Sequence, residues 1–244
     1  MAAQHNENKI HSASKFGKFQ DYIGEFVYGG IDGSVTTFAV VAGATGAELS
    51  SSVVIILGFA NLIADGFAMS VGSYLSTKSE KQNYEKHKAI EYWEIENLRE
   101  REVEEVREIY ENYGFKGKLL EDIVAHITSD KDRWVEVMMK EELEMQEEAK
   151  TPLGMGAATF AAFIIMGFIP LIVYIYDYLA ETTSNLFMTS SIMTGLTFMG
   201  IGFLKSKVTG TSKIRGVIET LILGGAAAIL SYFVGDWLEK LIAG

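Results

Sequence analysis

Five long apolar stretches alternate with polar segments along the 244-residue chain. They run from about 26–47, 49–76, 153–176, 182–204 and 216–235. A helix needs about 20 mainly apolar residues to cross the hydrocarbon core of a bilayer, and each stretch is long enough. Because lipid offers the backbone no hydrogen-bond partners, a spanning segment must be helical. The pattern therefore predicts an all-α membrane protein with five transmembrane helices.

A polar segment, residues 77–150, separates the second apolar stretch from the third, and we call it the insert. It holds 21 acidic and 13 basic residues. Residues 79–112 contain neither Gly nor Pro and are dense in good helix formers. We expect them to form one helix that continues the second span.

The rest of the insert predicts two further helices. Gly114 and Gly117 mark a break, after which a short helix is expected over 118–128. Asp130 is suited to cap a third helix, which should run to about residue 150. The expected order is an N-terminal segment (1–20), spans one and two (21–76), a three-helix metal-binding insert (77–150) and spans three to five (151–244).

Lysine and arginine in the short links predict the orientation, because they are enriched on the cytosolic side of a membrane. The links after spans one and three contain none. The positive links carry Lys9, Lys15 and Lys18 before span one, and Lys205, Lys207, Lys213 and Arg215 between spans four and five. We expect a cytosolic N-terminus and insert, and a C-terminus outside or in a lumen. Both a plasma membrane and a vacuolar membrane fit this pattern.

The composition excludes several classes of function. The chain has no cysteine, which rules out disulfides and thiolate metal sites. A net charge of −11 without a basic patch argues against nucleic acid as a partner. We expect no enzymatic activity, and no cofactor beyond a transported or regulatory divalent metal.

The first span carries one charge, Asp32. A charged side chain at mid-membrane costs at least about 2.5–3.5 kcal/mol, so it usually marks a pathway or a site. Asp21, Glu25 and Asp32 fall at i, i+4 and i+11, on one stripe that leads inward from the cytosolic surface. We interpret Asp32 as an ion ligand and the other two as an ion entrance, although solvation at the membrane surface explains Asp21 and Glu25 equally well.

A second polar stripe follows span two. Asn61, Asp65 and Met69 fall at i, i+4 and i+8. If the two stripes face each other, Asp32 and Asp65 supply hard oxygen ligands, Met69 supplies a soft thioether, and Asn61 lies on the ion path. The alternative for Met69 is simple packing, because methionine is a common gap filler.

The insert carries an acidic stripe. With Leu98 between them, Glu91, Glu94, Glu102 and Glu105 are spaced to share one helical face, where they repel one another unless cations intervene. The default explanation of such a charge run is a solvated face.

Methionines accompany acids on the third expected helix, where Met138 and Met139 lie beside Glu142. Carboxylate and thioether ligands, without cysteine or clustered histidine, favour Fe²⁺ or Mn²⁺ over Mg²⁺ or Ca²⁺.

Residues 28–33 (YGGIDG), 58–70 (GFANLIADGFAMS) and 74–76 (YLS) together resemble the vacuolar iron transporter family. The resemblance covers the chain from about Asp21 to the C-terminus. Two positions depart from the pattern: Ser73 replaces an acid that members often carry, and Asn61 stands where some members have an acid.

The resemblance implies a proton-coupled exporter of cytosolic Fe²⁺, with Mn²⁺, Co²⁺ and Zn²⁺ as related substrates. It implies a homodimer in the lipid bilayer, with the ion path between the two copies of spans one and two. The ligands it implies are Asp32 and Met69 in the membrane, and Glu91, Glu94, Glu102, Glu105, Met138, Met139 and Glu142 in the insert.

We therefore expect a metal:proton antiporter. Two other interpretations stay open: a membrane-anchored metal sensor or store whose insert binds iron, and a solute transporter that uses no metal.

Overall fold

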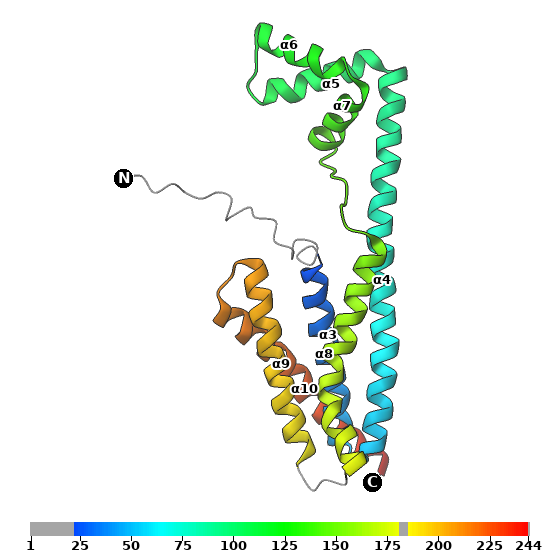
Figure 1. The fold of residues 1–244 in the computed structure, drawn as a ribbon, viewed down its shortest axis with the longest axis vertical. Helices are drawn as coiled ribbons and strands as arrows, with labels where there is room; N and C mark the ends of the chain where they lie inside the picture. The colour runs from blue at the N-terminus through cyan, green and yellow to red at the C-terminus, as the bar shows by residue number, and fades with distance from the viewer. Residues whose placement is uncertain (1–21, 181–184, 244) are drawn as a thin grey trace, which may run out of the picture. The chain divides into compact units, whose positions relative to one another are not determined.

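The computed structural model describes residues 22–180 and 185–243, and within them every element is helical (Figure 1). The elements are α3 (Ile23–Gly46), α4 (Ser51–Asn97), α5 (Arg99–Asn112), α6 (Gly117–Thr128), α7 (Lys131–Val137), a π-helix η1 (Met138–Glu142), α8 (Pro152–Ala180), α9 (Leu186–Thr209) and α10 (Lys213–Ala243). They divide into two compact units. One ends at Tyr74 and resumes at Pro152, and the other is Leu75–Thr151.

The first unit consists of α3, the N-terminal part of α4, α8, α9 and α10. Each of the five helices is long and apolar enough to cross a membrane, which confirms the predicted number of spans. Large apolar side chains cover their outer surfaces; Ile56, Leu196 and Leu230 are each more than half exposed. Monomeric soluble proteins rarely show apolar patches of this extent, whereas lipid tails accommodate them.

Helix α3 is the centre of this unit, since it packs against α8, α9 and α10. Its contact with α8 depends on glycine. A Cβ on Gly33 would lie 2.4 Å from the carbonyl oxygen of Phe163, and one on Gly29 would lie 2.6 Å from that of Thr159. Small residues let membrane helices approach this closely. The glycines around Asp32 therefore hold α3 against α8.

Helix α10 meets its neighbours in the same way. A Cβ on Gly235 would lie 2.0 Å from the carbonyl oxygen of Gly43 in α3. Gly224 contacts the ring of Phe198 in α9, whereas Gly225 has open space beside it.

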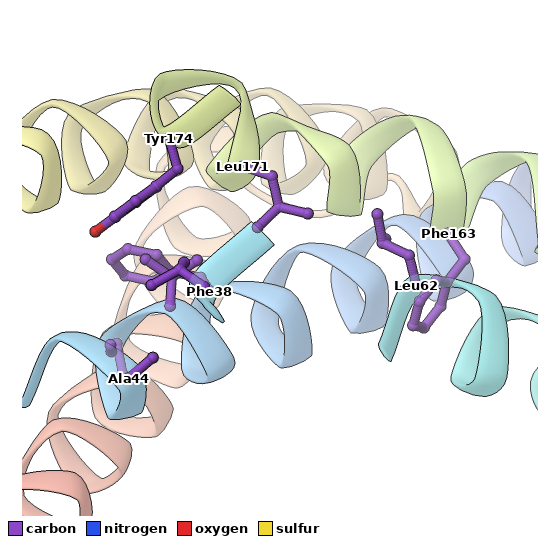
Figure 2. Packing of buried hydrophobic residues seen from close by; sticks show 10 residues of the cluster. Phe38, Ala44, Leu62, Phe163, Leu171 and Tyr174 are labelled. Atoms are coloured by element: carbon purple, nitrogen blue, oxygen red, sulfur yellow. The ribbon is translucent and has the colours of Figure 1, made fainter. Parts of the chain in front are cut away.

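A cluster of buried side chains joins α3, α4 and α8. Figure 2 shows Leu62 from α4 beside Phe163 from α8. Further along α8, Leu171 and Tyr174 turn toward Phe38 from α3. The Tyr174 hydroxyl lies 3.1 Å from that of Thr45, which ties α8 to the end of α3. This packing fixes the faces that α3 and α4 present to each other.

The second unit contains the rest of α4 and α5 to η1 around its own core. Asp130 caps α7 by accepting a 2.9 Å hydrogen bond from the Arg133 amide, as predicted. Gly114 and Gly117, with φ of +96° and +58°, form the predicted break between α5 and α6. The core contains Ile95, Val106, Leu120, Val124, Ile127, Trp134, Val135, Met138 and Met139.

The prediction of one continuous helix over 79–112 is wrong. Helix α4 ends at Asn97, and Leu98 leaves the helical conformation with φ −125° and ψ 31° before α5 begins. A straight helix would hold Ile95 and Val106 about 16 Å apart along its axis. Because both belong to one core, the chain must bend between them. Packing thus overrides a sequence with no helix breaker.

The third insert helix is also shorter than expected. It ends with η1, where the Leu143 amide bonds to the Met138 carbonyl at 3.1 Å. Glu144 then adopts a left-handed conformation with φ +52°, and the Met145 amide bonds back to the Met139 carbonyl at 2.8 Å. Glycine is the usual residue where a helix ends in the left-handed conformation. Because glutamate stands here, the sequence did not indicate the end of the helix.

Replacing Gly33 with alanine should destabilise the membrane unit, because the new methyl group meets α8 backbone. Overpacking of this kind costs about 1–3 kcal/mol. Gly200→Ala in α9 is the matched control, since nothing lies within 4 Å of its added Cβ. Thermal unfolding in detergent should show a lower midpoint for Gly33→Ala alone. Equal midpoints would contradict the close α3–α8 contact.

Candidate metal-binding sites

Three carboxylates converge at the corner between α4 and α5. Glu91, Glu94 and Glu102 each offer one oxygen, and these oxygens lie within 4.8 Å of one another. A continuous helix would separate Glu91 from Glu102 by about 16 Å along its axis. The bend at Leu98 therefore brings together residues that the sequence placed on one long stripe. We call these three residues the corner cluster.

The corner cluster takes carboxylates out of water. The exposed Arg101 acts electrostatically on Glu94 and Glu102, but it forms its ion pair with Glu105 instead. Glu91 and Glu102 are 3% and 2% exposed, and Oε2 of each has no hydrogen-bond partner among the described residues. Within the described part of the chain, no lysine or arginine forms an ion pair with a member of the cluster. Buried charges are normally paired or bound to a metal. The arrangement requires a cation or a proton.

The electrostatics of the corner cluster favour the proton when no cation is near. Burial raises the pKa of Glu91 from 4.5 to about 7, with further contributions from Glu142, Glu94 and Glu105. Burial likewise raises the pKa of Glu102 to about 7, with Glu105 as the strongest neighbour. Metals bind the deprotonated form, so protons and metal compete for these oxygens near neutral pH.

Two of the other predicted acids lie at the edge of the cluster. Glu105 is half-buried and pairs with the exposed Arg101 at 2.9 Å. Glu142 is mostly exposed, yet its charge acts on Glu91 and Glu102. Partial desolvation and the charges of Glu105 and Glu94 raise the pKa of Glu142.

The predicted methionine ligands are both buried, at 0% for Met138 and 1% for Met139, and both pack in the insert core. Met139 also lines a cavity of about 540 Å³ together with Met145. They lie on η1, and single-turn π-helices occur frequently at functional sites. Met138, Met139 and Glu142 therefore all lie on one short π-helix.

Two tyrosines that the sequence did not single out brace this region. The Tyr92 hydroxyl donates a 2.7 Å hydrogen bond to Asp132, which ties α4 to α7 beside Glu91. Tyr113, at the end of α5, donates to Glu141 in η1. Both bonds join segments far apart in the sequence, so spacing could not reveal them.

In the membrane unit, single residues of the two polar stripes lie near each other. Asp32 and Asp65 are partly buried and lie within electrostatic range of each other. The Asn61 amide donates to the Thr36 hydroxyl at 3.4 Å, and Thr36 donates to the Asp32 carbonyl at 2.8 Å. Asn61 therefore helps to join α4 to α3 one turn from Asp32.

Met69 packs against the apolar cluster of the membrane unit, in agreement with a packing role. The described contacts do not join it to Asp32. Asp21 lies outside the described residues.

Glu25 is held by two hydroxyl groups from two other helices. Ser73 of α4 and Thr159 of α8 donate to its Oε2 at 3.1 and 3.0 Å. Glu25 is half-buried, so it is not a freely solvated surface acid.

The five long apolar helices are those of an integral membrane protein, and the insert holds a carboxylate cluster suited to a divalent cation. The sequence model of the VIT family matches residues 23–236. The chain belongs to the VIT family.

Curated relatives agree with this assignment along nearly the whole chain. A protein of Toxoplasma gondii named vacuolar iron transporter is 34% identical over 99% of this chain and 80% of its own length. A Plasmodium falciparum protein of the same name is 30% identical over 98% and 88%. Vacuolar iron transporter 1 of Arabidopsis thaliana is 29% identical over 91% and 88%.

Acidification without metal should stabilise the insert. Folding raises the pKa values of Glu91 and Glu102 from 4.5, the ordinary value of an exposed glutamate, to about 7. Because the folded insert holds these protons more tightly than the unfolded chain, their binding stabilises the fold. This stabilisation is full below pH 4.5 and is lost as the pH rises through 7. With Trp237→Phe in the membrane unit, Trp93 and Trp134 report insert unfolding by fluorescence. The unfolding temperature should fall between pH 5 and pH 8.

Mn²⁺ should reverse this trend at pH 8. Binding to the folded state alone adds about 2.7 kcal/mol at a concentration of 100 Kd, and the gain should shrink below pH 7. Glu102→Gln removes one buried charge, so it should be more stable than the parent without metal and lose most of the gain. A solvated charged face predicts no response to pH or Mn²⁺ in either protein.

Proposed function

We propose that the chain is a proton-coupled transporter that exports divalent transition metal ions, Fe²⁺ first, from the cytosol. The observation that carries this proposal is the corner cluster, whose buried carboxylates form no ion pair with the described residues, in a chain of the VIT family. The names of the relatives, which specify iron and a vacuole, support the choice of ion.

The insert gathers metal in this proposal. Glu91, Glu94 and Glu102 supply the first oxygens, and Glu105 and Glu142 extend the acidic surface around them. Met138 and Met139 add thioether sulfur after a change of rotamer in η1, which favours Fe²⁺, Mn²⁺, Co²⁺ or Zn²⁺ over Ca²⁺ and Mg²⁺. In this role the insert is cytosolic, where it meets the ions to be exported.

The membrane unit carries the ion across. The ion enters past Asp21 and Glu25, binds at Asp32 with Asp65, Asn61 and Met69 nearby, and leaves on the luminal or outer side. Two copies of the chain place two such sets of residues along a shared path. Because α10 exposes most of its surface, the unit has ample area for a partner copy or for lipid.

Proton coupling follows from competition for carboxylates. A ligand that must lose its proton to bind metal regains one when the metal leaves. When the metal leaves on the luminal or outer side, protons from that side bind the free carboxylates. A proton gradient directed into the cytosol therefore drives the exchange. In this proposal the positive links face the cytosol, with the N-terminus in the cytosol and the C-terminus in the lumen or outside, in a vacuolar or plasma membrane.

A membrane-anchored sensor or store is the second candidate. The insert favours it, because the corner cluster is complete within the compact unit Leu75–Thr151. Asp32 and Asp65 argue against it, since an anchor has no use for intramembrane carboxylates.

Proteoliposomes separate these candidates. With the lumen acidic, a transporter should accumulate Fe²⁺, Mn²⁺, Co²⁺ or Zn²⁺ inside the vesicles and release luminal protons. A sensor or store should bind metal without accumulation, and a solute transporter of another class should not respond to metal.

Asp32→Ala should abolish metal uptake while the variant folds and associates like the parent. The reason is the loss of the one charged ligand in α3 that lies within the membrane. Size-exclusion chromatography and thermal unfolding provide the control for folding. Normal uptake by a well-folded Asp32→Ala protein would exclude Asp32 as a ligand.

Met69→Leu distinguishes ligation from packing. Leucine has nearly the same volume as methionine, so the substitution should cost less than about 1.5 kcal/mol in packing, and it removes the sulfur. If the thioether binds the ion, transport of Fe²⁺ and Co²⁺ should fall more than transport of Mn²⁺. The same loss for every ion would assign Met69 to the apolar cluster alone.

A further inference from the structure

We propose that Ser73 and Thr159 are positioning residues that hold the Glu25 carboxylate in place for the incoming ion. This inference rests on the proposed transport function and adds two residues to it. Neither residue ligates metal in this account; each acts through Glu25.

The geometry converges from three helices. Glu25 lies in the first turn of α3, Ser73 near the end of the apolar part of α4, and Thr159 in α8. Both hydroxyls donate to the same oxygen, Oε2, at 3.1 and 3.0 Å. Two donors on one oxygen leave the direction of Oε1 defined, because the carboxylate can no longer rotate freely.

The position of Thr159 is itself fixed. Its side chain is completely buried, and its one hydroxyl proton is shared between Glu25 and the Met155 carbonyl, each 3.0 Å from Oγ1. One turn beyond Glu25, Gly29 meets the backbone of Thr159 so closely that an added Cβ would lie 2.6 Å from its carbonyl oxygen. The α3–α8 contact thus places the donor within reach of Glu25.

Hydroxyl groups suit this task better than lysine or arginine. A cationic partner would hold Glu25 equally well but would cancel its charge and repel a divalent ion. Serine and threonine orient the carboxylate and leave its charge available. Hydrogen bonds of this outer kind around metal-binding carboxylates typically change metal affinity by about 10–100-fold when they are removed.

Ser70 offers a matched control in the same place. It also joins α4 to α8, by donating to the Gly156 carbonyl at 2.8 Å, and it does not contact Glu25. A variant of Ser70 therefore loses an interhelical hydrogen bond of the same kind without freeing the carboxylate.

The test is Mn²⁺ uptake into proteoliposomes over a range of concentrations. Ser73→Ala and Thr159→Val should each raise KM by about tenfold with little change in maximal rate, because ion capture is impaired. Ser73→Thr should restore the parent KM, and Ser70→Ala should leave it unchanged. If one variant does not fold, the other gives the same comparison.

A double variant tests whether the effect passes through Glu25. In a Glu25→Gln background, Ser73→Ala should add no further rise in KM, since the group it positions has lost its charge. An additive rise would overturn the inference. So would a parent-like KM for Ser73→Ala and Thr159→Val while the parent protein transports Mn²⁺. Absence of uptake by the parent would overturn the proposed function and this inference together.

Discussion

Taking a carboxylate out of water costs several kcal/mol unless a proton or a cation neutralises it, and both units of this protein are organised around that constraint. In the insert, Glu91 and Glu102 are buried with an unpartnered oxygen each. In the membrane unit, Asp32 and Asp65 lie within electrostatic range of each other. Glu91 and Glu102 become stable when a cation or protons bind, so occupancy and stability are linked in the insert.

The surrounding structure maintains this situation. The core of the insert pulls Ile95 and Val106 together, which forces the corner at Leu98 and thereby presses Glu91 against Glu102. In the membrane unit, glycines clamp α3 to α8, and the same contact places Thr159 on Glu25. The free energy of apolar packing is large enough to hold like charges close together against their electrostatic repulsion.

Sequence alone predicted the features that depend on local composition. The five spans followed from hydropathy, the capping of α7 from Asp130, and the break after α5 from Gly114 and Gly117. Each of these signals lies within the segment that it shapes. Helical periodicity also placed Asp32 and Asp65 each on a polar stripe of its own helix, but it left open whether the two stripes face each other.

The features that sequence missed depend on tertiary contacts. No glycine or proline marks the bend at Leu98, and a glutamate occupies the left-handed stop at Glu144. The hydroxyls of Ser73 and Thr159 meet on Glu25 only after three helices pack. The sequence placed the glutamates of the insert on a stripe along one helix, whereas the structure brings Glu91, Glu94 and Glu102 to a corner between two.

The central claim is that metal and protons compete for the buried corner cluster. Calorimetric titration of the full-length protein with Mn²⁺, in buffers of different ionisation enthalpy, counts the protons released per bound ion. With Glu91 and Glu102 titrating near pH 7, binding at pH 6 should release protons. The number should fall toward zero above pH 8, and Glu102→Gln should weaken binding. Binding to the parent protein with no proton release at pH 6, or unchanged binding to Glu102→Gln, would contradict the account.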